Sequence, residues 1–145
     1  MLIGNFEAKL DQIKGRTALP VKFRQNWSRK IIVTMGYEGA LLIVDQKSWE
    51  KLTADIVNRP FISQPARETD RFLLGNAYEL DLDSQGRFVL PLQLREYANL
   101  GKKVIFVGMG NRVELWAAEK WQIQVKYLKD NISRISQKLE ETGGK

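Results

Sequence analysis

The chain has 145 residues, 43% of them hydrophobic, so its length and composition are those of a folded domain with a buried core. It contains no cysteine and no histidine, which excludes disulfides and thiolate metal sites and removes the commonest general base and metal ligand of enzymes. Lysine and arginine outnumber aspartate and glutamate by 23 to 17, a net charge of +6. Many soluble proteins carry a mild excess of this size, so its distribution along the chain is more informative.

The N-terminal segment MLIGNFEAKLDQ has too short an apolar run before its first charges to be a signal peptide. No later window approaches the roughly 18 apolar residues of a membrane-spanning helix. We therefore expect a soluble cytoplasmic protein with no membrane contact. The same composition predicts no cofactor and no metal site.

A polar stretch after this segment occurs twice in the chain. LDQIKGRTALP spans residues 10–20, and LDSQGRFVLP spans residues 82–91. In both copies a Gly-Arg pair precedes a short apolar run that ends in proline, and a further arginine, Arg24 or Arg95, follows four residues after that proline. Since proline suits the first turn of a helix, each copy predicts a strand, a polar loop, a second short strand and a short helix.

Two apolar strands and a helix are predicted after each of these units. The strands are expected at residues 31–36 and 40–44 in the first copy, and at 104–110 and 113–116 in the second. One helix carries Trp49, another begins at Gln64 or Pro65 and ends at Gly75, and Asn58-Arg59-Pro60 breaks the chain between them. Apolar residues at 3–4 spacing predict a long amphipathic helix over residues 117–139.

These elements predict an α+β fold made of two tandem pseudo-repeats, residues 1–75 and 76–145, the second ending in the long helix. A unit of this size cannot easily bury both faces of its strands. We therefore expect the two repeats to pack on each other as one compact, intertwined domain. The tryptophans fall at predicted strand or helix positions and are assigned to core packing.

The repeated loop is built to present an arginine. In the second copy Asp83 or Ser84 can bond to the backbone just ahead, and Gly86 provides a conformation that other residues resist. Arg87 then begins the next strand. In the first copy Lys14 and Arg16 flank Gly15. Arginine binds phosphate and reads guanine by a bidentate contact, so both loops are candidates for contact with DNA.

Charge separates the two copies. Residues 9–30 carry seven basic residues and one acid, whereas residues 80–101 carry two basic residues and three acids. Arg24, one of the seven, is a further candidate DNA contact. A basic surface of this kind is often only solvated. If the loops do bind DNA, the charge distribution predicts that Lys14 and Arg16 contribute more than Arg87.

The stretch GRFVLPLQLR resembles the swapped-hairpin DNA-binding domains of the AbrB type, in which Asp-x-x-Gly-Arg-x-x-x-Pro leads into a short helix. Two such units in a chain of this length resemble the MraZ family. The resemblance implies an AbrB-like swapped-hairpin β-barrel with peripheral helices. It implies a nucleoid-associated bacterial transcriptional regulator of the division and cell-wall gene cluster. The implied partners are double-stranded DNA, at short direct repeats in its own promoter, and further copies of the chain in a ring.

The resemblance also implies which residues face DNA: Gly15 and Arg16 in the first copy, and Asp83, Gly86 and Arg87 in the second. The first copy departs from the motif. Gln12 stands four residues before Arg16, where the aligned residue would be Asp, and Asp11 lies one place earlier. Either Asp11 closes a reshaped loop, or the first loop is held in another way.

Two other functions fit parts of the sequence. The same fold occurs in antitoxin-like proteins that bind a protein partner, and the C-terminal helix would then be the docking element. An enzyme would need the acid pairs, Asp81 with Asp83 or Asp11 with Glu7, to form a catalytic site. Nothing else converges on either pair, so we expect no enzymatic activity.

Overall fold

The computed structural model describes residues 1–57 and 61–143. The predicted break at Asn58-Arg59-Pro60 lies outside these residues. The strands are β1 (Asn5–Lys9), β2 (Arg16–Ala18), β3 (Lys30–Met35), β4 (Leu41–Asp45), β5 (Tyr78–Asp81), β6 (Arg87–Val89), β7 (Lys103–Gly108) and β8 (Val113–Ala117). The helices are α1 (Val21–Arg24), α2 (Gln46–Val57), α3 (Gln64–Leu73), α4 (Leu92–Tyr97) and α5 (Ala118–Glu141). The fold is α+β, as predicted.

Local sequence signals account for most of these boundaries. Pro20 and Pro91 cap the short helices α1 and α4, where a missing backbone N–H leaves no bond unmade. Ser63 caps α3, and its side chain accepts a hydrogen bond from the backbone N–H of Ala66. The predicted strand pairs and the long terminal helix are confirmed to within one or two residues.

The two halves of the chain exchange strands. The main sheet is antiparallel, with the order β1-β7-β8-β4-β3-β5. Strand β1, from the first half, therefore pairs with β7 of the second, while β5, from the second half, pairs with β3 of the first. Strand β2 likewise pairs with β6 in a second, two-stranded sheet. Each half thus completes the sheet of the other.

The expected closed β-barrel is not found among the described residues. A barrel needs a continuous ladder in which the last strand pairs with the first. Here the edge strands β1 and β5 each pair on one side only, and β2 and β6 pair with each other. β2 and β6 have three residues each and form a separate sheet, so they do not join the edge strands of the large sheet. The result is an open six-stranded sheet beside a two-stranded ribbon.

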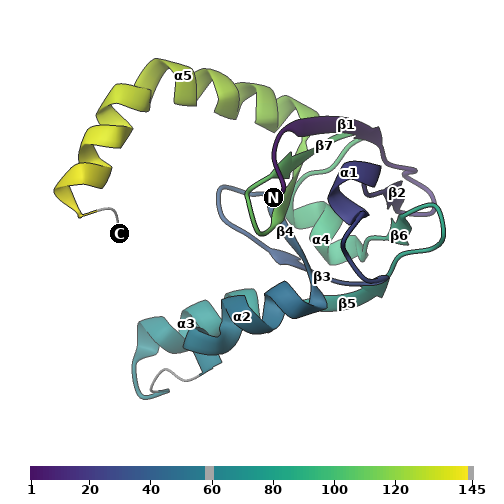
Figure 1. Ribbon diagram of the computed structural model, residues 1–145, viewed down its shortest axis with the longest axis horizontal. Coiled ribbons are helices and arrows are strands. Elements are labelled where there is room, and N and C mark those ends of the chain that lie inside the picture. Colours follow the sequence, from purple (N-terminus) through teal and green to yellow (C-terminus); the bar gives the residue numbers. More distant parts are fainter. Residues whose placement is uncertain (58–60, 144–145) are drawn as a thin grey trace.

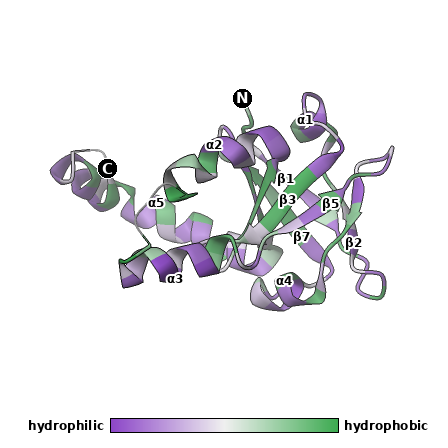
Figure 2. Ribbon diagram, turned by 90° about the horizontal axis from the view of Figure 1, so that it is seen from below, coloured by the Kyte–Doolittle hydropathy of each residue, from purple (hydrophilic) through white to green (hydrophobic). Residues whose placement is uncertain are grey.

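The main hydrophobic core contains residues of both halves. Its fully buried side chains include Phe23 and Ile43 from the first half and Leu90 and Phe106 from the second. Figure 2 shows an apolar stretch along β3 inside the body, whereas α3 and α5 alternate between apolar and polar residues along their lengths. Burying a large apolar side chain stabilises the fold by about 1.5–3 kcal/mol. Since the buried side chains come from both halves, each half contributes to the stability of the whole fold.

The molecule has two distinct ends. Helices α2, α3 and α5 extend from one end of the sheet, and the β2–β6 pair with its loops forms the other (Figure 1). Helix α5 leaves the body after its first turns, and its one buried residue is Ala118. Within residues 1–57 and 61–143, no helix combines the length and apolar character that crossing a lipid bilayer requires.

Candidate nucleic-acid interface

The β2–β6 pair, called the ribbon below, carries both predicted arginines. Arg16 lies opposite Val89, and Arg87 lies opposite Ala18, so the two arginines are diagonal neighbours, typically about 7–8 Å apart. Side chains alternate along a strand. Thr17 and its partner Phe88 are buried, so Arg16 and Arg87 share the outward face of the ribbon.

The second loop, residues 82–86 between β5 and β6, is closed by Asp83. Its Oδ1 accepts hydrogen bonds from the backbone N–H of Gln85 at 2.9 Å and of Arg87 at 2.8 Å. Its Oδ2 pairs with Arg87 Nε at 2.6 Å. The backbone N–H of Arg87 lowers the pKa of Asp83 to about 2, and the Arg87 side chain and the Gln85 N–H act in the same direction. The side chain of Arg87 is therefore tied to its own loop.

This geometry predicts a pH response of the second loop. Because the pKa of Asp83 is lowered in the folded protein, its stabilising effect is complete above the ordinary value near 3.8 and is lost as the pH falls through about 2. An NMR titration of the Asp83 carboxyl carbon should give a midpoint near 2. In the wild-type protein the amide signals of Gln85 and Arg87 should shift over the same pH range. In Asp83→Asn, which has no carboxyl group at this position, that shift should be lost. A midpoint near 3.8 would contradict the loop geometry.

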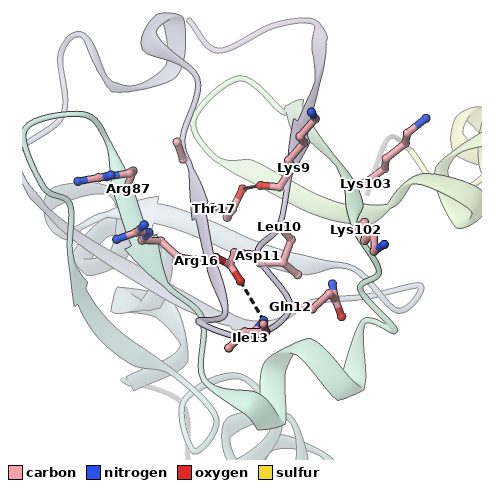
Figure 3. A pocket seen from close by; sticks show the side chains of 11 residues that line it. Lys9, Leu10, Asp11, Gln12, Ile13, Arg16, Thr17, Arg87, Lys102 and Lys103 are labelled. Carbon is pink, nitrogen blue, oxygen red and sulfur yellow. Dashed lines mark hydrogen bonds between the residues drawn. The ribbon is translucent and has the colours of Figure 1, made fainter.

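The first loop, residues 10–15 between β1 and β2, is closed by Asp11, which resolves the question raised by Gln12. Asp11 Oδ1 accepts hydrogen bonds from the backbone N–H of Ile13 at 2.9 Å (Figure 3) and of Lys14 at 3.1 Å. These bonds, that of Lys14 first, lower the pKa of Asp11. In contrast to Arg87, the side chain of Arg16 makes no hydrogen bond or ion pair within the described residues. The one-residue insertion thus leaves Arg16 free to bind a ligand.

Gly15 is held by an arginine of the other half. The backbone N–H of Leu90 donates to Gly15 O at 2.8 Å, and Arg95 Nε donates to Leu90 O at 3.0 Å. Gly15 has a φ of +69°, and an added Cβ would lie 2.9 Å from Arg95 Cζ. The positive φ therefore favours glycine at this position, and a Cβ would in addition displace the end of the Arg95 side chain.

The second loop is held in the same way from the first half. The backbone N–H of Leu19 donates to Gly86 O at 2.9 Å, and Arg24 Nε donates to Leu19 O at 3.2 Å. An added Cβ at Gly86, where φ is +77°, would collide with the Arg24 side chain. Arg24, predicted as a DNA contact, thus lies partly buried against Gly86 and holds the opposite loop.

A groove of about 870 Å³, called the basic groove below, opens beside the first loop. Its lining residues include five cations: Lys9, Arg16, Arg87, Lys102 and Lys103. Figure 3 shows Arg16 and Arg87 on one side of the groove and the three lysines on the other. The acid in the lining is Asp11, whose Oδ1 already accepts two backbone hydrogen bonds. The groove is therefore strongly suited to an anion.

The structure brings most of the predicted site residues to one end of the molecule. Lys14 is exposed in the first loop, Arg16 and Arg87 share the ribbon face, and Asp83 closes the second loop. Lys102 and Lys103 were not predicted from the sequence, because the charge comparison of the two copies covered only residues 80–101 of the second. The signal was the Lys-Lys pair before a buried strand, in the place that Arg29 and Lys30 take in the first copy.

Comparison with known proteins places this arrangement in a family. The model of the family described as "MraZ protein, putative antitoxin-like" matches the chain twice, at residues 1–72 and 73–141. Curated relatives named transcriptional regulator MraZ match at full length. That of Syntrophomonas wolfei is 37% identical, and that of Caldicellulosiruptor saccharolyticus 39%, each over 143 residues and 99% of both chains. That of a Thermoanaerobacter species is 34% identical over 141 residues, covering 97% of this chain and 98% of the relative.

Two matches to one family model agree with the two copies of the Gly-Arg loop and with the exchange of strands between the halves. The likeness to the relatives covers both loops and the terminal helix, since it extends over nearly the whole chain. The chain belongs to the MraZ family.

Proposed function

We propose that this chain is a sequence-specific DNA-binding transcriptional regulator that contacts double-stranded DNA with the ribbon and its two loops. The observation that carries the proposal is the placement of Arg16 and Arg87 on one outward face of a two-stranded ribbon. The major groove of DNA admits a two-stranded ribbon, and arginine is the commonest side chain to read guanine there. The names of the relatives support a regulatory role.

The two loops contribute unequally in this proposal. The side chain of Arg16 makes no hydrogen bond or ion pair within the described residues, whereas Arg87 must give up or share its 2.6 Å pair with Asp83 to reach DNA. Lys14 lies exposed next to Gly15 and adds a phosphate contact. Arg24 holds the second loop through Gly86 and acts on DNA through that loop.

Footprinting tests this proposal. We propose, from the family resemblance, that the sites are short direct repeats in the promoter of its own gene, within the bacterial division and cell-wall gene cluster. Wild-type protein should protect repeated segments in the DNA upstream of its gene, and Arg16→Ala should lose that protection. Absence of any protected segment with folded wild-type protein would overturn the proposal.

Salt dependence offers a second prediction. If each protomer makes about four phosphate contacts, affinity should fall roughly 100-fold between about 50 and about 200 mM salt, because bound cations release counterions from DNA. The measurement is a fluorescence-anisotropy titration at several salt concentrations, with the pH held constant. A flat profile would contradict phosphate binding by the loops.

We further propose that the protein assembles into a homo-oligomer, by the resemblance a ring, through the helical end. Ile123, Ile132 and Leu139 on α5 are exposed, and α5 projects away from the sheet (Figure 1). A ring would present identical loops in series, so that contacts with repeated DNA sites reinforce one another. The ribbon lies at the opposite end from α5, so DNA binding and self-association need not compete for one surface.

The second candidate function is an antitoxin-like module that binds another protein. The description of the family model favours it, and the apolar residues of α5 are the surface it would use. Co-purification from the native host separates the two. Recovery of a small toxic protein whose capture is lost in Ile132→Glu would support this function, and recovery of the protein alone would argue against it.

A further inference from the structure

Three lysines outside the Gly-Arg motifs line one side of the basic groove (Figure 3). Lys9 ends β1, Lys102 precedes β7 and Lys103 begins it. All three side chains are exposed, and none makes a hydrogen bond or ion pair within residues 1–57 and 61–143. No role in the ribbon or in the loops accounts for them.

Two of these lysines are placed against each other. In the antiparallel register of β1 and β7, Lys9 lies directly opposite Lys103. Like charges at directly opposed positions destabilise a strand pair. The pair therefore works against folding, and an anion bound between the two ammonium groups would relieve it.

The equivalent position in the other half has the opposite arrangement. There Lys30 lies opposite Asp81, an oppositely charged pair. Asp81 corresponds to Lys9, because each ends the first strand of its half and precedes a buried leucine, Leu82 or Leu10. Each pair joins a strand of the first half to a strand of the second. The pair of Lys30 and Asp81 combines opposite charges, whereas the pair of Lys9 and Lys103 leaves two positive charges side by side.

Hydrogen bonds fix the lysine backbones relative to Arg16. The hydroxyl of Thr17, the residue after Arg16, donates to Lys9 O at 2.8 Å. The backbone N–H of Leu10 donates to Lys102 O at 2.8 Å. Because Thr17 is buried, these bonds hold the backbones of Lys9 and Lys102 beside the ribbon, while their side chains stay exposed.

We infer that Lys9, Lys102 and Lys103 form a binding site for a phosphodiester group of the DNA backbone, next to the contacts made by Arg16. This inference rests on the proposed function. It assigns the lysine side of the groove to the phosphate backbone of the DNA. Phosphate contacts position a protein on DNA and carry no sequence information, whereas contacts with base edges specify the sequence. The lysine site therefore sets affinity and register, and the ribbon sets specificity.

The test compares full-length wild-type protein with the double variant Lys9→Gln, Lys103→Gln. Each is titrated at several salt concentrations against a duplex from upstream of its own gene and a mixed-sequence duplex of equal length. Loss of two phosphate contacts should reduce the slope of log affinity against log salt by about 2 on both duplexes. The ratio of the two affinities should not change.

The control is Arg29→Gln, Lys30→Gln, which removes the same charge from the positions that correspond to Lys102 and Lys103 in the other copy. Its salt slope should stay at the wild-type value. The melting temperature gives a second readout. The melting temperature of Lys9→Gln, Lys103→Gln should be no lower than that of the wild type, because the change removes a like-charge pair. The variant should therefore bind DNA more weakly without losing stability.

The possible failures are distinguishable. If wild-type protein binds the upstream duplex with a steep salt dependence and the double variant matches it, the lysine site is overturned and the proposed function stands. An equal loss of slope in the control variant would also overturn the site, since net charge alone would then explain the effect. If wild-type protein binds neither duplex, the proposed function falls and the lysine site with it.

Discussion

Replacing Arg16 with alanine is expected to weaken binding to the upstream DNA roughly 5- to 150-fold per site, the range for loss of one bidentate contact with a base. The fold should be unaffected, because the Arg16 side chain makes no hydrogen bond or ion pair within the described residues. The measurement is an equilibrium gel-shift titration at constant salt, with circular dichroism as the check on folding.

Two further variants define what Arg16 does. Arg87→Ala is the matched control, and it should lose less affinity, since Arg87 is held by Asp83 in the free protein. Arg16→Lys keeps the charge and loses the planar guanidinium. If Arg16 reads a base, the lysine variant should lose discrimination between the upstream and mixed-sequence duplexes. Unchanged affinity in Arg16→Ala would remove the ribbon from the proposed interface.

Replacing Phe106 with alanine should have the largest effect on stability, a loss of about 3–5 kcal/mol in the free energy of unfolding. Phe106 is fully buried on β7, opposite Phe6 and Leu115, and its ring lies 6.4 Å from that of Phe88. Domains of this size are stable by only about 5–15 kcal/mol, so much of the total would be lost. Urea unfolding monitored by circular dichroism measures the change.

Phe61→Ala is the control for this change, because the Phe61 side chain is 78% exposed. Its effect should stay within about 0.5 kcal/mol. The experiment also tests our proposal that residues 1–75 and 76–145 form one folding unit. Strand β1 of the first half pairs with β7, so Phe106→Ala should lower the unfolding midpoint of both halves in a single transition. Two separate transitions would contradict the exchange of strands.

Local patterns were enough to predict the secondary structure and the loops. The prolines before α1 and α4, the positive-φ glycines at Gly15 and Gly86, and the 3–4 spacing along α5 each act over a few residues. For that reason they can be read from a single sequence. The possibility that Asp11 closes the first loop was also open from the sequence, and the hydrogen bonds to Ile13 and Lys14 decided it.

The sequence by itself therefore determined an α+β chain of two repeats, each presenting an arginine after a glycine turn, and a positive charge concentrated in the first repeat. Only the tertiary structure decided which strands pair. It places Lys9 opposite Lys103, lays Arg24 against Gly86, and leaves the sheet open where a barrel was expected. These contacts join residues far apart in the chain. They depend on how the two halves bury their apolar faces together, which no local pattern encodes.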